Sequence, residues 1–562
     1  MAAATKSAAS SAANAELVYV PLGGAGEIGM NLYLYGTGTG KDRRWLMVDL
    51  GVTFPGDLEP GVDLILPDTQ FIEAQRDKLV GIVLTHAHED HFGAVIDLWP
   101  DLRTPVYATP FAAGLLKAKL AEYPIEEKIE IHEVQQGSKL TLGPFDCELI
   151  NVAHSIPEPN ALLIKAAGRT ILHTGDWKLD DEPVVGTQID QPRFTQAGFE
   201  GVDVMVCDST NVFREGSSPT EGEVGRSLTE IIKRSSGRVA VTTFASNVAR
   251  LLSVAMAAKA SGRHLVVVGR AMLRVINVGL ETGALPEGFS YLTQEEARHL
   301  RPNDVLLLLT GSQGEPRAAL ARVAMDQHPH ISLSPGDTVI FSSRTIPGNE
   351  KSVGRVQNAL AGMGAKLITD TDALVHVTGH PRREELKQLY KWVQPKALIP
   401  MHGERRHLEE HVRFARDNGI GEALVVTNGD LVDLSPGALQ VIDQVPTGRV
   451  LRDGELLLEG DDVSVRERRK LSEVGIVFVA LAVNKRGDLA ADPEVEIDGI
   501  PPEDEHGDPL GAAIAKAVRG ALKSIPQKRR KDTGLLADAA KRAARGAVNK
   551  AWGKKPIVKA VV

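Results

Sequence analysis

The stretch Thr-His-Ala-His-Glu-Asp-His, residues 85–91, constrains the fold of this chain more than any other. It places His86, His88, Asp90 and His91 within six positions. Imidazole nitrogens and carboxylate oxygens suit zinc and related metals. An apolar run typical of a buried strand precedes the stretch, and a helical pattern follows it. Ligands crowded on a loop at a strand end can converge on two adjacent metal ions. The alternative is a polar loop that is histidine-rich by chance.

The same succession of an apolar strand and a ligand-type residue occurs at four other places. These are residues 45–48 with Asp49, 145–152 with His154, 170–173 with Asp176, and 397–401 with His402. Between residues 212 and 371 the pattern changes to alternating helices and strands, as in a parallel sheet flanked by helices. The simplest organisation is a strand-rich domain with a second α/β domain inserted into it.

Changes of pattern predict the domain boundaries. They are a disordered Ala/Ser-rich tail at 1–16, the first part of the strand-rich domain at 17–211, the inserted domain at 212–372, the second part of the first domain at 373–446, a charged irregular linker at 447–470, and a small C-terminal domain at 471–562. The second half of the last domain is basic. A solvated helix face, RNA contact and subunit assembly all stay open for it.

Composition excludes several classes of protein. There is no run of about 18 apolar residues, so no membrane helix is expected, and the N-terminus lacks the apolar core of a signal peptide. Two cysteines, Cys147 and Cys207, exclude a disulfide scaffold and fit a reducing cytoplasm. A metal site must therefore be built from histidine and aspartate. The formal charge of −9 argues against a basic coat but leaves a nucleic-acid substrate open, because local patches decide binding.

The ordered motifs resemble those of a known fold. Asp49, the 86–91 cluster, His154 and Asp176 match the metallo-β-lactamase fold in order. Three later motifs resemble those of β-CASP nucleases: Asp208-Ser209-Thr210-Asn211, His376-Val377-Thr378-Gly379-His380 and Met401-His402-Gly403-Glu404. Residues 23–29 and 341–350 are similar to stretches of the bacterial ribonuclease J family, although Ala271 and Thr378 stand where serine is commoner. The resemblance implies an α/β fold: a metallo-β-lactamase αββα sandwich with an inserted β-CASP α/β domain and a small C-terminal α/β domain.

The resemblance also implies a two-metal site. One zinc ion would be held by His86, His88 and His154, the second by Asp90, His91 and His402, and Asp176 would bridge them. Two Zn²⁺ per chain are expected, with Mn²⁺ or Mg²⁺ as alternatives because the same ligands accept them. The catalytic set would be His380, Asp208, Asp90 and Asp49. Asp49 would orient a ligand histidine or the attacking water; its alternative is a structural cap after a strand.

His380 would protonate the leaving 3′-oxygen, and Asp208 would hold it charged and oriented. The alternative is that His380 only donates a hydrogen bond to phosphate. Two segments are expected to bind substrate phosphates through backbone N–H groups. They are Ala245, Ser246 and Asn247, and the turn formed by His376, Val377, Thr378, Gly379 and His380. For the first segment a plain helix N-cap is the alternative.

A second lobe over the metal site would form a cleft that admits a single strand and binds its backbone with little base readout. The resemblance implies a ribonuclease acting on single-stranded RNA, as a 5′-to-3′ exonuclease preferring 5′-monophosphate ends with additional endonuclease activity. It further implies RNA maturation and mRNA decay in the cytoplasm, as a homodimer or homotetramer that could join an RNA-degradation assembly or the ribosome. Alternatives are another metallo-β-lactamase hydrolase, a β-CASP DNA repair nuclease, and a catalytically inactive RNA-processing scaffold subunit.

Overall fold

The structure is a computed structural model that describes residues 16–123, 125–435 and 439–562. The predicted tail, apart from Glu16, lies outside the described residues. The chain forms two compact units, one built mainly from Ile65–Val450 and the other from Phe54–Leu64 with Leu451–Val562. No helix in the described ranges is both long and apolar enough to span a membrane.

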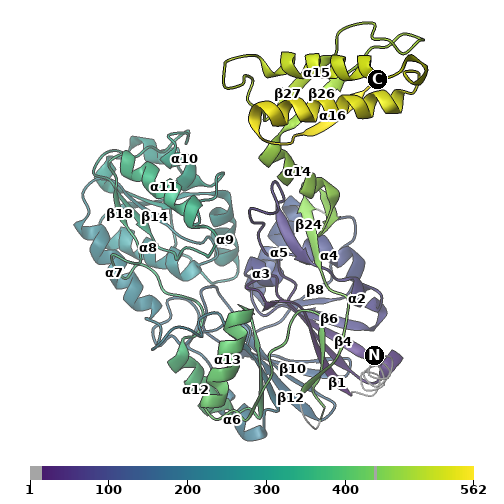
Figure 1. The fold of residues 1–562 in the computed structure, drawn as a ribbon. Helices are drawn as coiled ribbons and strands as arrows, with labels where there is room; N and C mark the ends of the chain where they lie inside the picture. The colour runs from purple at the N-terminus through teal and green to yellow at the C-terminus, as the bar shows by residue number, and fades with distance from the viewer. Residues whose placement is uncertain (1–15, 124, 436–438) are drawn as a thin grey trace. The chain divides into compact units, whose positions relative to one another are not determined.

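Two β-sheets packed face to face form the centre of the first unit (Figure 1). The first sheet has the order β23-β22-β1-β3-β4-β6-β7-β8. Its strands are β1 (Leu17–Gly23), β3 (Leu32–Thr37), β4 (Arg44–Val48), β6 (Leu79–Val83), β7 (Val106–Ala108), β8 (Ile131–Glu133), β22 (Asp430–Asp433) and β23 (Gln440–Gln444). Between these strands in the chain lie the short elements β2 (Ala25–Gly26), η1 (Gly40–Asp42), β5 (Leu64–Pro67), α2 (Gln70–Glu73), η2 (Arg76–Lys78), α3 (Glu89–Phe92), α4 (Val95–Leu102) and α5 (Pro110–Glu122).

The second sheet has the order β21-β19-β13-β12-β11-β10-β9. Its strands are β9 (Lys139–Leu142), β10 (Phe145–Asn151), β11 (Asn160–Ala166), β12 (Arg169–His173), β13 (Val204–Asp208), β19 (Ala397–Met401) and β21 (Glu422–Ala423). Apolar side chains of both sheets, such as Leu46, Leu162 and Ile399, fill the space between them. The other face of the second sheet is covered by α6 (Gln191–Glu200), α12 (Arg383–Val393) and α13 (Arg405–Asp417) through residues such as Phe194 and Leu389. The predicted strands at 45–48, 145–152, 170–173 and 397–401 are thus confirmed.

An α/β domain is inserted between β13 and β19 (Figure 1). Its five-stranded parallel sheet has the order β15-β16-β14-β17-β18. The strands are β14 (Val239–Thr242), β15 (His264–Val268), β16 (Val305–Leu309), β17 (Thr338–Phe341) and β18 (Lys366–Ile368). The helices are α7 (Glu221–Arg234), α8 (Val248–Ala260), α9 (Arg270–Glu281), η3 (Glu296–His299), η4 (Pro302–Asp304), α10 (Ala319–Ala324) and α11 (Glu350–Gly362). The alternating pattern predicted this parallel sheet correctly, whereas the domain boundaries stay predictions.

A buried ion network joins the sandwich to the inserted domain. Arg250 of α8 is fully buried and donates to Glu221 Oε2 (2.9 Å) and to the carbonyl oxygen of Val375 (2.8 Å). Lys178, also fully buried, lies 2.7 Å from Asp180 Oδ2. Buried charges are tolerated only when they are paired, so these groups depend on one another.

The second unit contains a three-stranded sheet, order β27-β26-β28, with α15 and α16 packed on one face. Its elements are β24 (Arg449–Asp453, which begins at the end of the first unit), β25 (Leu456–Glu459), α14 (Val463–Val474), β26 (Ile476–Ala480), β27 (Glu494–Asp498), α15 (Leu510–Ser524), η5 (Gln527–Arg529), α16 (Thr533–Trp552) and β28 (Ile557–Val561). The expectation of an irregular linker over 447–470 is wrong, because β24, β25 and the start of α14 lie within it. Asp462 caps α14 by accepting from Ser464 N. Only Val465 of α14 is buried, and such an exposed helix carries no apolar periodicity.

Candidate metal centre

The seven predicted ligands converge from the ends of strands in both sheets. His86 and His88 follow β6, Asp90 and His91 lie in α3, His154 follows β10, Asp176 follows β12, and His402 follows β19. They form two groups that share Asp176: His86, His88 and His154 with Asp176, and Asp90, His91 and His402 with Asp176. Within each group the ligand atoms lie within 4.8 Å of one another. The strand-end positions therefore meet as the sequence predicted.

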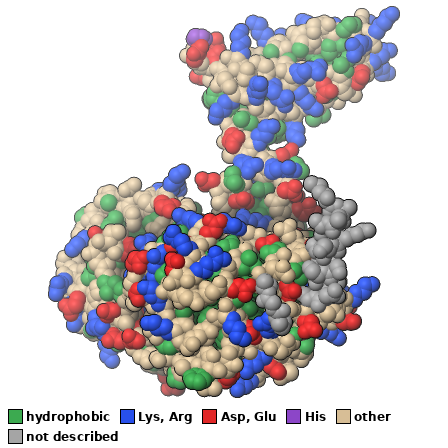
Figure 2. All heavy atoms as spheres, turned by 60° about the horizontal axis from the view of Figure 1, so that its bottom comes forward, with side chains coloured by type: hydrophobic (Ala, Val, Ile, Leu, Met, Phe, Trp, Pro, Cys, Tyr) green, Lys and Arg blue, Asp and Glu red, His purple; other side chains and the backbone are tan. Residues whose placement is uncertain are grey.

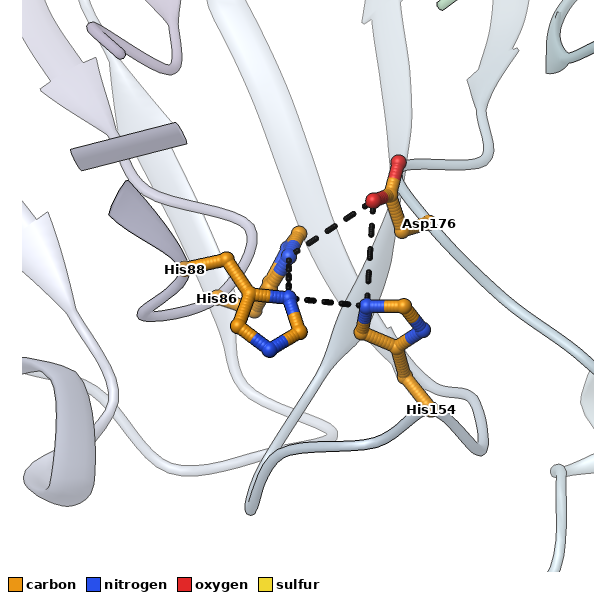
Figure 3. A group of neighbouring side chains, drawn as sticks. All are labelled: His86, His88, His154 and Asp176. Atoms are coloured by element: carbon orange, nitrogen blue, oxygen red, sulfur yellow. Dashed lines mark hydrogen bonds and ion pairs between the residues drawn. The ribbon is translucent and has the colours of Figure 1, made fainter. Parts of the chain in front are cut away.

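In the first group three imidazoles and one carboxylate point toward a common centre, as Figure 3 shows. His88 Nδ1 lies 3.1 Å from His86 Nε2 and 2.9 Å from His154 Nε2. Asp176 Oδ2 lies 3.8 Å and 3.7 Å from the same two Nε2 atoms. Four such donors around one point match the nitrogen and oxygen ligands of a tetrahedral zinc site.

Hydrogen bonds behind the first group determine which nitrogens carry protons. His154 Nδ1 donates to the carbonyl oxygen of Gly379 (2.6 Å), so its Nε2 presents a lone pair. Thr85 Oγ1 donates to Asp49 Oδ2 (2.8 Å) and must accept from His86 Nδ1 (3.0 Å), so His86 Nε2 also presents a lone pair. Both lone pairs face His88 Nδ1, which can offer at most one proton. The centre is therefore rich in acceptors and suits a cation.

The second group contains Asp90, His91 and His402 beside the same aspartate. His402 Nε2 lies 3.1 Å from Asp90 Oδ2, and His91 Nε2 lies 3.2 Å from Asp176 Oδ2. Thr210 Oγ1 donates to the carbonyl oxygen of His402 (3.2 Å) and accepts from its Nδ1 (2.7 Å). His402 therefore directs Nε2 toward the carboxylates, where this atom carries a proton or, with a cation present, would be free to bind it.

The surroundings of Asp176 show whether this site suits metal ions. Its Oδ2 lies within 4 Å of ring nitrogens from both groups, while its buried Oδ1 has no hydrogen-bond partner among the described residues. A buried carboxylate oxygen without a partner costs free energy in the absence of a cation. The orphaned oxygen and the donor set fit divalent metal ions, and they fit a bridging carboxylate.

The two groups differ in protonation. Burial lowers the pKa of His86 and His154 well below its usual value and that of His88 to about 4, so these imidazoles are neutral. At His91 and His402 burial also opposes charge, but the carboxylates of Asp176 and Asp90 outweigh it and raise the pKa. Without a cation, protons on the second group balance the carboxylates; a divalent cation would supply that charge instead.

Asp49 lies directly behind the second group. Its φ of 62° is in the left-handed region, which costs a non-glycine residue free energy. The conformation directs Oδ2 toward His91 Nδ1 (2.7 Å), and Oδ1 accepts from Thr85 N (2.7 Å). This geometry supports the predicted role of orienting a ligand histidine.

The predicted acid and its partner lie beside the metal groups. Asp208 Oδ2 accepts from His380 Nδ1 (2.8 Å), and that nitrogen lies 3.8 Å from Asp176 Oδ2. Although burial alone would lower it, the carboxylates of Asp208 and Asp176 raise the pKa of His380 to about 9. His380 therefore carries a proton at neutral pH when no cation is bound.

Of the two predicted phosphate-binding segments, the first caps a helix and the second lies against the ligand group. Ser246 is half-buried, but the buried Asn247 caps α8 by accepting from Arg250 N (2.9 Å) and also hydrogen-bonds Glu221. In the second segment, a Cβ on Gly379 would lie 2.4 Å from His154 Cε1, so only glycine allows this turn to approach the ligand. His376 is not among the grouped ligands, and burial lowers its pKa to about 3. The phosphate contacts of Ala245, Val377 and Thr378 and their neighbours stay predictions.

Sequence reasoning missed several residues that hold the ligands in place. Asn31 Nδ2 donates to the carbonyl oxygen of Asp90 (3.0 Å) and lies 3.0 Å from His91 Nε2. Thr85 and Thr210 fix the histidine tautomers as described above. Asn31 follows the glycine-rich stretch 23–29, and Thr210 follows Asp208 within one motif. Adjacency to a motif is the only signal that could have pointed to them.

Comparison with known families agrees with this geometry. Residues 46–222 match the beta-lactamase superfamily domain, and residues 367–425 match the Zn-dependent metallo-hydrolase RNA specificity domain. Residues 236–360 match the ribonuclease J beta-CASP domain, and residues 463–562 the ribonuclease J C-terminal domain. Fold, ligand groups and matches together define a metal-dependent hydrolase: a metallo-β-lactamase sandwich with an inserted β-CASP domain and a small C-terminal domain.

Similar proteins narrow the class. The chain is 49% identical to a ribonuclease J of Sinorhizobium meliloti, over 97% of this chain and 96% of that one. It is 38% identical to a ribonuclease J of Mycolicibacterium smegmatis, over 96% of this chain and 95% of that one. The chain belongs to the ribonuclease J family. A crystal structure of a protein of unknown function from Enterococcus faecalis shares the fold, with a TM-score of 0.51 and 17% identity over 74% of this chain and 99% of that one.

Proposed function

We propose that this chain is a ribonuclease that hydrolyses phosphodiester bonds of single-stranded RNA. It acts as a 5′-to-3′ exonuclease that prefers 5′-monophosphate ends, with additional endonuclease activity, in RNA maturation and mRNA decay. The observation that carries the proposal is the pair of ligand groups sharing Asp176, with Asp208 and His380 beside them. The ribonuclease J relatives and the RNA specificity domain match support RNA as the substrate.

Two cations are proposed, held by the two ligand groups, with Zn²⁺ as the first candidate and Mn²⁺ or Mg²⁺ as alternatives. When bound there, such ions would activate a water molecule and polarise the phosphoryl oxygens. The protein residues do the rest of the positioning. Asp49 holds the His91 ring, Thr210 holds that of His402, and Gly379 that of His154. Ring orientation set in this way keeps the lone pairs directed at the centre.

His380 is proposed as the general acid. Its Nδ1 donates to Asp208, so its Nε2 is the atom that gives a proton to the leaving 3′-oxygen as the bond between phosphorus and that oxygen breaks. Asp208 is fully buried, and its other oxygen accepts from Thr210 N (2.9 Å), which keeps the carboxylate in place. Protonation of the leaving group is needed because an alkoxide is a poor leaving group at neutral pH.

An assay of metal content and cleavage tests the proposal. The chain is offered single-stranded RNA with a 5′-monophosphate, a 5′-triphosphate or a 5′-hydroxyl, together with DNA of the same sequence. We expect two metal equivalents per chain and the fastest loss of 5′-monophosphate RNA. A protein that holds two metals and degrades none of the RNAs would remove the hydrolase proposal, and equal degradation of DNA would remove the preference for RNA.

We further propose a homodimer or homotetramer that acts in the cytoplasm and could join an RNA-degradation assembly or the ribosome. The buried, unpaired Cys147 and Cys207 support a reducing compartment. Light scattering coupled to gel filtration tests the assembly: a monomeric mass at micromolar concentration would contradict it.

A further inference from the structure

The inserted domain contains a cavity that the metal centre does not use. Its volume is about 470 Å³, and it lies at the ends of β15 and β16, beside Val268 and Thr310. Its wall also includes the start of α9, Tyr291, residues 293–295 and several residues between 317 and 328. None of its lining residues belongs to the ligand groups. In α/β domains ligands bind at the carboxyl ends of parallel strands, so this is the edge at which a second site is expected.

The cavity is cationic. Arg270, Arg317 and Arg322 line it with exposed side chains, and within the described ranges neither Arg270 nor Arg317 has a side-chain ion-pair or hydrogen-bond partner. The only carboxylate in its wall is Glu295, whose Oε1 already lies 3.3 Å from His330 Nε2. Over the larger, lower part of the face shown in Figure 2, by contrast, basic and acidic side chains are interspersed. Guanidinium groups left without carboxylates bind phosphate through paired hydrogen bonds.

The start of α9 adds backbone donors to the same cavity. Gly269 is its N-cap, with φ 133°, and no side chain caps the helix. A Cβ on Gly269 would lie 2.5 Å from Thr310 Cγ2, so only glycine lets the ends of the two strands come this close. The first N–H groups of this twelve-residue helix are thereby left for a ligand, and the helix dipole favours an anion there.

The remaining wall is apolar and contains an aromatic ring. Val267, Leu273 and Ala318 line it together with the half-buried Tyr291, whose ring centroid lies 6.4 Å from that of Phe289. An aromatic ring and an apolar floor beside unpaired arginines are the surroundings in which a nucleobase stacks while its phosphate is neutralised. An inorganic anion would leave the apolar part of the cavity unused.

We propose that this cavity binds a nucleoside phosphate, either as a free nucleotide or as a segment of an RNA strand. Arg270 and Arg317 would bind the phosphate and Tyr291 would contact the base. The inference does not depend on the hydrolysis proposed above, because binding is measured without cleavage. Its failure and that of the proposed function are therefore distinguishable: a chain that binds but does not cleave loses only the hydrolase proposal.

The test compares two variants of the full chain. In Arg270→Gln/Arg317→Gln two of the three cavity arginines are neutralised; in Arg355→Gln an equally exposed arginine of the same domain, outside the cavity, is neutralised. Free AMP is titrated by calorimetry. A labelled single-stranded RNA of roughly 12 nucleotides, a length in the range of single-strand binding sites, is titrated by anisotropy, in a background carrying Asp176→Ala.

We expect the double variant to bind AMP, the RNA or both about tenfold more weakly, since each lost arginine removes a charge-assisted hydrogen bond. Arg355→Gln should change affinity by less than about twofold, because this arginine lies outside the cavity and an exposed charge without a ligand contact contributes little. Weakening of both ligands identifies a site for free nucleotides, and weakening of RNA alone identifies a strand segment. The proposal is overturned if the double variant binds both ligands like the unchanged chain, or if Arg355→Gln weakens binding to the same extent. Tyr291→Leu should weaken the same ligand, which loss of charge alone would not explain.

Discussion

Replacing Thr210 by valine tests the metal centre without touching a ligand. The substitution keeps the shape of the side chain and removes its hydroxyl, which accepts from His402 Nδ1 at 2.7 Å. The imidazole N–H is then buried without a partner, since Asp208 Oδ1, at 3.9 Å, is too far away for a hydrogen bond. Leaving a buried donor unsatisfied costs about 1–3 kcal/mol, which corresponds to roughly 5- to 150-fold in an equilibrium constant. Changes to such outer partners typically weaken metal binding by about 10- to 100-fold.

The assay is competition for Zn²⁺ against a chromophoric chelator, read as two binding steps per chain. We expect Thr210→Val to weaken one step by about 10- to 100-fold and leave the other unchanged, because Thr210 contacts only the second group. Thr210→Ser restores the hydroxyl and should restore the affinity. Ser209→Ala is the matched control: the hydroxyl of this neighbour contacts His411 (2.8 Å) and no ligand. Two unchanged binding steps in Thr210→Val, with the fold intact by circular dichroism, would refute the reasoning.

Three other substitutions test the metal groups, the proposed acid and the buried ion network separately. Asp176→Ala should lower bound metal to less than one equivalent by mass spectrometry and abolish RNA cleavage, because both groups lose a ligand; two retained metals would contradict this. His380→Ala should reduce kcat by about 10²- to 10⁴-fold, the usual contribution of a general acid, with metal content unchanged; an unaltered kcat would remove the assigned role. Glu221→Gln should lower the free energy of unfolding at neutral pH by about 3 kcal/mol, because it leaves Arg250 buried without its partner. Although burial alone would raise it, Arg250 and Lys178 hold the pKa of Glu221 below its usual value. Its stabilisation is therefore present above the unfolded pKa of about 4.3 and lost as pH falls through the lower folded pKa. Thermal melts between pH 7 and 3 measure this: the melting temperature should change less with pH for Glu221→Gln than for the unchanged chain or for the exposed control Glu230→Gln. Equal pH dependence of the melting temperature in all three would contradict the linkage.

The sequence predicted the elements that carry the ligands because a buried strand followed by a histidine or aspartate is a local pattern. β12 before Asp176 and β19 before His402 are examples. The contacts that orient the ligands are not local: Thr210 and His402 are 192 positions apart, and a hydroxyl has no periodic signature. The burial of charged side chains could not be predicted from the sequence either. Lysine and arginine are usually exposed, and Lys178 and Arg250 are buried only because carboxylate partners far away in the chain lie beside them.

The placement of Phe54–Leu64 in the second unit shows a related limit. This segment lies between stretches of the sandwich in the chain. Its two prolines, two glycines and three acidic residues are typical of a loop, and such a loop occurs within domains as well as between them. Domain boundaries read from changes of pattern detect an insertion as long as the β-CASP domain. They miss a loop whose assignment depends on contacts with residues near 452.

The turn at residues 208–211 connects the second ligand group with the proposed acid, His380. Its four consecutive side chains contact four separate partners: Asp208 binds His380, Ser209 binds His411, Thr210 binds His402, and Asn211 Nδ2 donates to Thr378 Oγ1 (2.9 Å). His402 is a proposed metal ligand and His380 the proposed acid, while His411 lies in α13 and Thr378 lies in the turn that contains His380. A displacement of about 1 Å in such an arrangement can cost about 100-fold in rate. A single short turn at the end of a buried strand sets the separation of His402 and His380 more tightly than two independent loops could.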